Sequence, residues 1–235
     1  MIDLSSVVVT GLGTIHAAGH GRQASAAAVG ASAPRWSVVD RPAGYHRPKG
    51  SRLAGLVGGL DLSPWLKPAE SRRMSAPSRW ATAAARMALE DAGLALDPDA
   101  DPPTAVVAAN AHGPTSILEK ILTQNLREGP LSVSPALFTE SVANAPAAQV
   151  AIACRARGPN VTVVQRDAGP LIAVAQAAAE ITAGRASRAL VIVMDELTPL
   201  LHAILDRFHG LAVAGEDGEE AARPFDRRRS GGIAA

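Results

Sequence analysis

Short apolar runs recur along the chain, each followed by polar or turn-forming residues, and they predict buried strands. The runs are VVV at 7–9, TAVVAAN within the strand and turn at 104–113, VTVV within 161–170, and ALVIV within 189–197. Each run is predominantly apolar instead of alternating between apolar and polar residues, which is typical of parallel strands that are covered on both faces. Gly11 and Gly13 after the first run lack the third glycine of a dinucleotide loop and the Lys-Ser/Thr of a P-loop, so they indicate a plain turn.

Between these runs, apolar and small residues recur at helical spacing. One predicted helix has Ser78 as its N-cap and stops at Gly93, and another begins at Pro114. Further helices are predicted up to about Gly158, over 171–185 and over 199–210. Strands that alternate with helices predict the α/β class, with a mostly parallel sheet covered by helices on both faces.

Two regions differ from this pattern: residues 32–77 are rich in proline and glycine, and residues 211–235 are acidic and then basic. We expect one domain over residues 1–235, with an irregular excursion at 32–77 and a mobile tail at 211–235.

Composition narrows the choice of partners. Of the 235 residues, 47% are hydrophobic but only 3% are aromatic, and the formal net charge is +1, so nucleic acid is not an expected partner. The single cysteine, Cys154, excludes an internal disulfide and a cysteine-based metal cluster. The N-terminus has Asp3 in place of a basic leader, and the sequence has no apolar run of about 18 residues. We therefore expect a cytoplasmic protein that binds no membrane, metal or cofactor.

Six segments, taken together and in this order, carry a resemblance to a known family. They are VVVTGLGTI, NAHGPTS, GPLSVSPALFTESVANAPAAQVAI, GPNVTV, the DEL that ends the 189–197 stretch, and RPFDRRRSGG. The chain resembles the N-terminal half of a β-ketoacyl-ACP synthase of the thiolase superfamily, and residues 32–77 carry little of the resemblance. A thiolase-like fold is what the resemblance implies.

In that family the strand after GPN ends in a nucleophile elbow, where the start of a helix lowers the pKa of a catalytic cysteine. Alignment from Gly158 places Asp167 at the cysteine position, whereas alignment from Gly169 places Arg166 there. Neither side chain forms a thioester by transacylation. Cys154 lies upstream, and we interpret it as a small core residue.

The family also has two further catalytic histidines and a lysine in a C-terminal half, and the sequence ends at Ala235 before that half. The six histidines present lie outside the family's histidine motifs. His112, which follows a strand, comes nearest to a functional position, and we assign it a structural role.

A synthase-like half without the nucleophile resembles a chain-length factor, the inactive partner that helps shape the acyl tunnel of a true ketosynthase. The resemblance implies no catalytic residue, no enzyme activity alone, and a heterodimer with a full-length β-ketoacyl-ACP synthase in polyketide, polyene or fatty-acid-type biosynthesis. We favour aryl polyenes over aromatic polyketides. Its edge strand NVTVVQ resembles the strand that pairs across the family's two-fold axis. The candidate tunnel and interface residues are Leu137, Phe138, Ser141, Asn144, Pro146, Gln149, Val163, Gln165, Arg166 and Asp167.

Within that set, we interpret the polar cluster 165–167 as a structural plug, an Arg-carboxylate pair at the dimer interface. Two other functions stay open: a standalone malonyl-ACP decarboxylase or acyltransferase that uses Asp167 or Arg166, and a homodimeric scaffold without a catalytic partner. The sequence is also compatible with a fragment of a longer chain. An acidic acyl carrier protein is a further candidate partner, against the alternative that the arginines are simply solvated. The arginines in question are Arg22, Arg35, Arg41, Arg47, Arg52, Arg72 and Arg73.

Overall fold

A computed structural model describes residues 7–31, 35–41, 47, 49–96, 99, 103–215 and 218–234. The parts of the irregular excursion and of the tail that fall between these ranges lie outside the described residues. Contacts divide the chain into two compact units. Unit 1 comprises residues 1–14 and 61–196, and unit 2 comprises residues 15–60 and 197–235.

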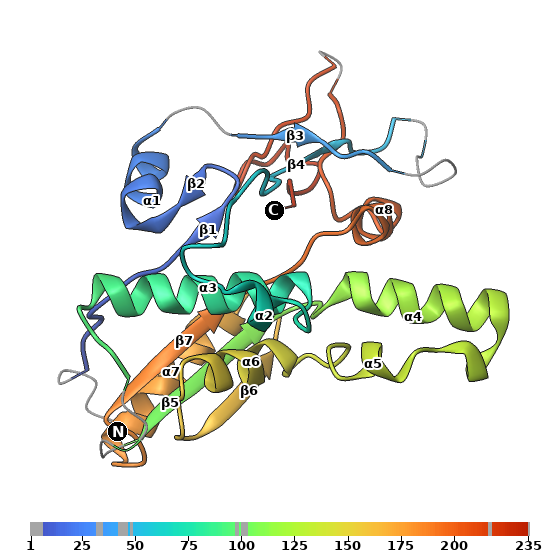
Figure 1. Cartoon of the computed structure of the whole chain (residues 1–235). Coiled ribbons are helices and arrows are strands. Elements are labelled where there is room, and N and C mark those ends of the chain that lie inside the picture. Colours follow the sequence, from blue (N-terminus) through green and yellow to red (C-terminus); the bar gives the residue numbers. More distant parts are fainter. Residues whose placement is uncertain are drawn as a thin grey trace. The chain divides into compact units, whose positions relative to one another are not determined.

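Unit 1 is built on a parallel sheet of three strands in the order β6-β5-β7 (Figure 1). The strands are β5 (Thr104–Asn110), β6 (Asn160–Val164) and β7 (Arg188–Val193). Val106 of β5 lies opposite Asn160 on one side and Leu190 on the other. Every residue of β5 is buried, which explains why the five residues between Thr104 and Asn110 are all apolar.

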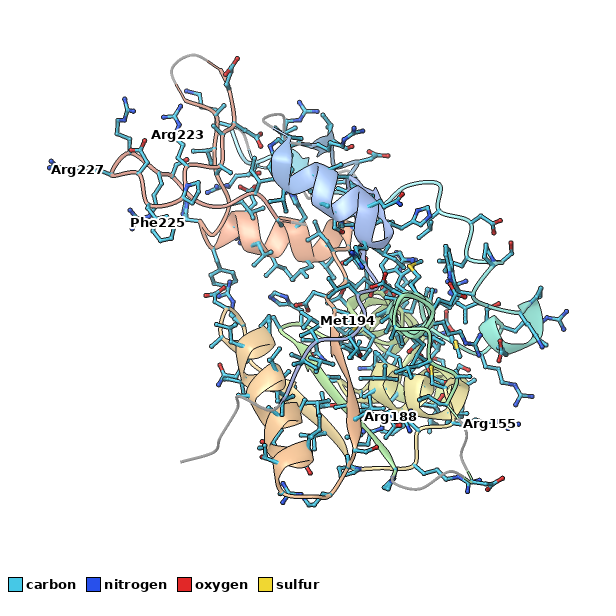
Figure 2. The ribbon with its side chains drawn as sticks, turned by 90° about the vertical axis from the view of Figure 1, so that its left-hand side faces the viewer. Arg155, Arg188, Met194, Arg223, Phe225 and Arg227 are labelled. Carbon is cyan, nitrogen blue, oxygen red and sulfur yellow. The ribbon has the colours of Figure 1, made fainter. Side chains whose placement is uncertain are left out.

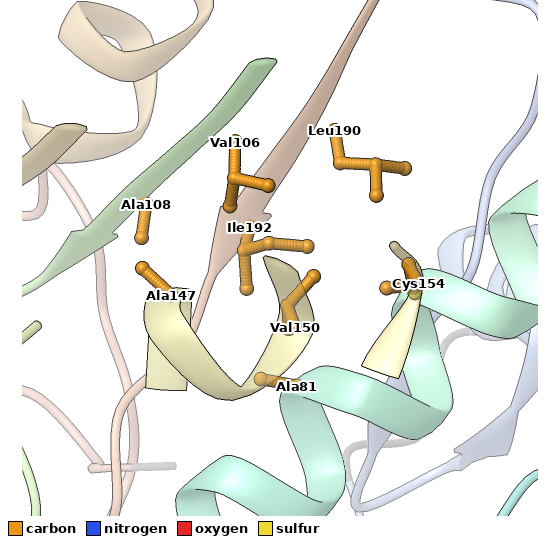
Figure 3. Close-up of a cluster of buried hydrophobic side chains, with 9 residues drawn as sticks. Ala81, Val106, Ala108, Ala147, Val150, Cys154, Leu190 and Ile192 are labelled. Carbon is orange, nitrogen blue, oxygen red and sulfur yellow. The ribbon is translucent and has the colours of Figure 1, made fainter. Parts of the chain in front are cut away.

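The two faces of β5 contribute to two separate cores, because alternate side chains of a strand point to opposite faces. Val106 and Ala108 pack with residues of α3 (Ala76–Asp91) and α6 (Ala145–Ala153), as Figure 3 shows. Val107 and Ala109 pack against α7 (Gly169–Thr182) on the other face. The predicted α/β class, with helices on both faces of a parallel sheet, is therefore confirmed.

Two helix ends differ from the prediction. Helix α3 begins at Ala76, and Ser75 instead of Ser78 is its N-cap: the Ser75 side chain accepts a hydrogen bond from the Ser78 amide. Pro77 stands in the first turn, where its fixed φ favours helix initiation. Helix α6 ends at Ala153, well before Gly158, because Arg155 adopts a left-handed φ of 56° that breaks the helical path.

The run at 7–9 does not form a strand, and Val8 and Val9 are exposed. A β-branched run becomes a strand only where a neighbouring strand supplies hydrogen bonds, and no strand pairs with this segment in the part of the chain that the structure describes. The two glycines after it lie against α3: a Cβ at Gly11 would overlap the Ala88 carbonyl, and one at Gly13 the Ala84 carbonyl. Their role is close packing of backbones.

A projecting segment follows β5, and we call residues 114–144 the arm. It contains α4 (Thr115–Glu128), the short 3-10 helix η2 (Pro130–Ser132) and α5 (Pro135–Phe138). Figure 1 shows α4 leading away from the sheet and the η2–α5 stretch returning beside it. Of the residues of α4, only Ile117 is buried. The short helix α2 (Pro68–Ser71) precedes α3 in the same unit.

Unit 2 consists of short elements. They are β1 (Ile15–His16), β2 (Gly19–His20), α1 (Gly21–Gly30), β3 (Ser37–Val38), β4 (Leu53–Ala54) and α8 (Pro199–Arg207). β1 pairs with β2 and β3 with β4, both antiparallel. The described part of the expected tail is tied into this unit, since Leu211 and Ala212 are buried and Ala234 bridges to Ala54.

Candidate functional site

The loops that follow the three parallel strands meet at one edge of the sheet, since the carboxyl ends of parallel strands lie together. Backbone hydrogen bonds extend the pairing beyond the strands. The amide of Gln165 donates to the carbonyl of Asn110 (3.1 Å), and the amide of Met194 donates to the carbonyl of Ala109 (3.1 Å). The turn that carries Arg166 and Asp167 therefore lies next to the end of β5.

At this edge β6 passes into α7 through a tight turn. The Gly169 amide donates to the Arg166 carbonyl (3.2 Å), and Gly169 is the first residue of α7. Ala168 is the N-cap and provides no side-chain hydrogen bond, so the first amides of α7 have no side-chain cap. A strand-to-helix turn with an uncapped helix N-terminus beneath it is the backbone geometry that suits an anion or a thiolate.

The polar side chains of this turn lie in solvent. Gln165, Arg166 and Asp167 are all exposed. Within the described part of the chain, neither Arg166 nor Asp167 takes part in a side-chain hydrogen bond or an ion pair. The Arg-carboxylate pair expected at a dimer interface therefore stays a prediction, since among the described residues of this single chain the two side chains make no such pair.

Two acidic residues after β7 hold the loop between β5 and the arm. The carboxylate of Asp195 accepts hydrogen bonds from the amides of Ala111 (3.0 Å) and His112 (2.9 Å). Glu196 accepts one from the amide of Ser116 in the first turn of α4 (2.8 Å), where a negative charge is favourable. The Nδ1 atom of His112 lies 3.7 Å from Asp195 Oδ1, so this histidine belongs to the loop network.

The predicted arm residues differ in their surroundings. Phe138 is 67% exposed and Asn144 is exposed, whereas Leu137 is half-buried and Pro146 is buried. The Ser141 hydroxyl donates to the Phe138 carbonyl (2.8 Å).

The remaining candidates are linked to the core. Gln149 donates to Glu140 (2.7 Å). Val163 is half-buried against the α7 side of the sheet. Asn110 joins the arm to the elbow, because its carbonyl accepts from Gln165 and its side-chain amide donates to the Ala143 carbonyl (2.9 Å).

Sequence reasoning did not identify Glu140, which is only 4% exposed. Its carboxylate accepts hydrogen bonds from the Ser78 hydroxyl (2.6 Å) and the Ser75 amide (2.9 Å), in addition to Gln149. Burial acts to raise the pKa of Glu140, but the hydrogen bonds from Ser78, Ser75 and Gln149 together hold its pKa below the usual value. No local signal in the sequence reveals this, because the two serines are distant in the chain.

Cys154 lies in the apolar core between β5, β7, α3 and α6 (Figure 3). Burial raises the pKa of its thiol, and the nearby Arg86 only partly opposes this. A buried thiol with a raised pKa is a packing residue, which agrees with its interpretation from the sequence.

Other surface features belong to segments of the chain outside the elbow. A hollow of about 470 Å³ is lined by residues of the α6 C-terminus, among them Arg155 and Arg157, near the amino-terminal ends of the strands. Figure 2 shows Arg223, Phe225 and Arg227 on the segment that follows α8 in unit 2. Among the described residues, no cluster of three or more His, Cys, Asp or Glu side chains is arranged to hold a metal ion, and no helix is long and apolar enough to cross a membrane.

The arginines considered for carrier docking are not equivalent. Arg41 is buried and bonded to Asp206 and to the Ser51 carbonyl, and Arg47 also pairs with Asp206. The expectation that Arg41 is a solvated surface residue is therefore wrong, because it neutralises a buried carboxylate. Arg22, Arg35, Arg52, Arg72 and Arg73 are exposed.

The three-stranded parallel sheet, the elbow and the order of the motifs define a ketosynthase-type α/β unit. The chain belongs to the beta-ketoacyl synthase family: residues 5–235 match the family's N-terminal domain, "Beta-ketoacyl synthase, N-terminal domain". The 3-oxoacyl-acyl-carrier-protein synthase 2 of Rhizobium meliloti is 30% identical over 240 residues, which cover 96% of this chain and 55% of that protein. The synthase of the same name from Vibrio cholerae is 26% identical over 226 residues, which cover 96% of this chain and 54% of that protein.

Among solved structures, "The ishigamide ketosynthase/chain length factor" is similar to this chain with a TM-score of 0.80 and 27% identity, covering 95% of this chain and 54% of that one. This similarity confirms the thiolase-like fold. The chain spans about half the length of the curated relatives that it matches.

The relatives correct one expectation. We expected a protein that is not an enzyme, but these relatives are named as synthases, which are catalytic proteins. That expectation also rested on catalytic groups that the family places in a half of the relatives that this chain does not span. The absence of cysteine from the elbow does not by itself make the protein inactive.

Proposed function

We propose that this chain is a ketosynthase-like subunit that pairs with a full-length β-ketoacyl-ACP synthase, and that its arm contributes to the wall of the acyl tunnel in that pair. The exposed apolar surface of the arm carries the proposal. Phe138 is 67% exposed and Leu126 is 82% exposed, and Val142 and Leu122 are also exposed. Exposure of apolar side chains to water is unfavourable, and a covering surface removes this cost, which supports a protein partner.

The edge of the sheet supports pairing with a second protein of the same fold. β6 is an edge strand, with β5 on one side, and its five residues include neither proline nor a charged residue. Such an edge accepts a further strand readily. The solved neighbour that is named as a ketosynthase and chain length factor supports a second ketosynthase-like chain as the partner.

The exposed arginines Arg72 and Arg73 support docking of an acidic acyl carrier protein, and Arg41 does not take part in it. The polyene pathway stays a prediction.

Co-expression with candidate full-length synthases followed by size-exclusion chromatography tests the pairing. We expect the two chains to co-elute, and a chain that stays monomeric beside every candidate synthase contradicts the proposal. In the purified pair, Phe138→Ala tests the tunnel: loss of an aromatic side chain from the wall should lengthen the products. Phe208→Ala, which removes another exposed phenylalanine, serves as the matched control and should leave the product lengths unchanged.

A further inference from the structure

Glu140 is a buried carboxylate within a segment whose other side chains largely face solvent. It is 4% exposed, whereas Phe138, two positions earlier, is 67% exposed, and Thr139 between them is exposed as well. A buried carboxylate costs free energy unless hydrogen bonds replace the water that it loses. Its position therefore depends on fixed partners.

Those partners come from two other elements of unit 1. The Ser78 hydroxyl and the Ser75 backbone amide, at the start of α3, donate to the Glu140 carboxylate at 2.6 and 2.9 Å. The side-chain amide of Gln149, on α6, donates to the same carboxylate at 2.7 Å. The Ser75 hydroxyl donates in turn to the Ser78 hydroxyl (3.1 Å). The carboxylate also lies at the N-terminus of a 16-residue helix, where the helix dipole favours a negative charge.

The turn between Phe138 and Glu140 is held by its own hydrogen bonds. The Glu140 amide donates to the Leu137 carbonyl (3.2 Å), and the amide and hydroxyl of Ser141 both donate to the Phe138 carbonyl (3.1 and 2.8 Å). A displacement of Glu140 is therefore passed on to Phe138 through a short, bonded stretch of backbone.

We propose that Glu140 is a positioning residue that fixes the point from which Phe138 projects, and that it thereby narrows the range of acyl chain lengths. The proposal rests on the proposed function, in which Phe138 lies on the tunnel wall. A wall residue discriminates between chains that differ by one unit only if it is held in place. Glu140 touches neither the acyl chain nor the reacting atoms in this role.

The first test measures position without enzyme activity. A nitroxide spin label is attached after Phe138→Cys, and its mobility is compared with Glu140 intact, with Glu140→Ala and with Glu140→Gln. We expect Glu140→Ala to increase the mobility several-fold, and Glu140→Gln to restore most of the order, because its amide oxygen still accepts from the serines. Cys154 is buried and its thiol pKa is raised, so its labelling background is low and is measured in protein without Phe138→Cys.

A label attached after Leu126→Cys on α4 is the matched control for the arm. Its mobility should not respond to Glu140→Ala, and an equal increase at both labels would overturn the proposal in favour of general loosening. If Glu140→Ala does not fold, Gln149→Ala removes one of the three donors and should give a smaller increase at position 138 alone.

The second test uses the pair with a full-length synthase. Glu140→Ala should raise the share of products of other lengths several-fold, whereas Phe138→Ala should move the main product to a new length. If Phe138→Ala leaves the lengths unchanged, the proposed function fails. If Phe138→Ala changes them but Glu140→Ala gives the wild-type distribution, the positioning role of Glu140 fails while the proposed function stands.

Discussion

The elbow of unit 1 and a buried ionic cluster of unit 2 both contain arginine and aspartate, but in opposite surroundings. The ionic cluster consists of Asp206, Arg41 and Arg47. At the elbow, Arg166 and Asp167 are exposed and take part in no ion pair within the described chain. In unit 2, Asp206 is 1% exposed and accepts from Arg41 (3.4 Å), Arg47 (3.1 Å) and the Ser51 amide (3.0 Å). The charged side chains of the elbow are accessible to another molecule, whereas those of the ionic cluster stabilise the folded state.

The difference teaches where an aspartate is stabilising. Burial acts to raise the pKa of Asp206, but the Ser51 amide and the two guanidinium groups hold its pKa below the usual value. Gly50 completes the arrangement, because a Cβ there would overlap the carboxylate. Such a site persists only if every partner is present, whereas the elbow keeps its fold through backbone hydrogen bonds.

The largest expected effect is that of Asp206→Ala, which leaves the buried Arg41 without its counter-charge. We expect a loss of about 3–5 kcal/mol in the free energy of unfolding of this unit. Urea unfolding followed by circular dichroism measures it. Asp206→Asn, which keeps the shape, should lose less, and a loss below about 1 kcal/mol for Asp206→Ala would show that the cluster is not a stabilising unit.

Two glycines of unit 1 provide the next comparison. Gly13→Ala should cost at least about 1–3 kcal/mol, because the new methyl group would overlap the Ala84 carbonyl of α3. Gly169→Ala at the elbow should change stability by no more than about 0.5 kcal/mol, because its Cβ would meet Ala109 and Gln165 at an ordinary 3.6 Å. Thermal unfolding of the two variants checks both values, and equal effects would contradict this account of the 11–13 segment.

His202 gives the ionic cluster a pH dependence. It is fully buried, Nε2 donates to the Leu53 carbonyl (3.2 Å), and burial lowers its pKa below 6.5, with Arg41 adding to the effect. The unfolded chain therefore binds a proton that the folded chain does not, and stability should fall as the pH drops below about 6.5. The lowered pKa values of Asp206 and Glu140 extend the loss to lower pH, as both carboxylates become protonated.

Unfolding free energies measured at a series of pH values test this prediction. His202→Gln should be less stable at pH 7 but should show a flatter curve between about pH 6.5 and 5. An unchanged slope in that range would assign the pH dependence to other groups.

The smallest expected effect is that of Asp167→Ala, which should change the free energy of unfolding by less than about 0.5 kcal/mol. Its side chain is exposed and forms no hydrogen bond or ion pair with the residues that the structure describes. Urea unfolding beside Asp206→Ala gives the direct contrast, and a loss above about 1 kcal/mol would mean that the elbow, too, depends on its carboxylate.

The sequence predicted the elements whose stability is local or strongly patterned. The apolar run of β5 and the helix after Pro114 were found from hydrophobic spacing and turn residues. The start of α3 was misplaced because Ser75 and Ser78 both suit an N-cap, and only Pro77 in the first turn distinguishes them. The strand expected at 7–9 failed because strand formation depends on a neighbour.

The buried polar residues could not be predicted. Asp206 accepts a hydrogen bond from Ser51, and Glu140 accepts one from Ser75. The residues of each pair lie far apart in the sequence, and no spacing rule connects them. The elbow was located from its motif, but the exposure of Arg166 and Asp167 follows from what surrounds them and not from their identity.

The order of the strands in the sheet has a consequence for the way the protein folds during synthesis. β5 is the central strand and leaves the ribosome first, yet Val106 pairs with Asn160 and with Leu190, which are both made much later. An unpaired apolar strand must wait for two distant segments, so closure of the sheet is non-local and slow. Chaperone binding to nascent chains should therefore persist until β7 has emerged.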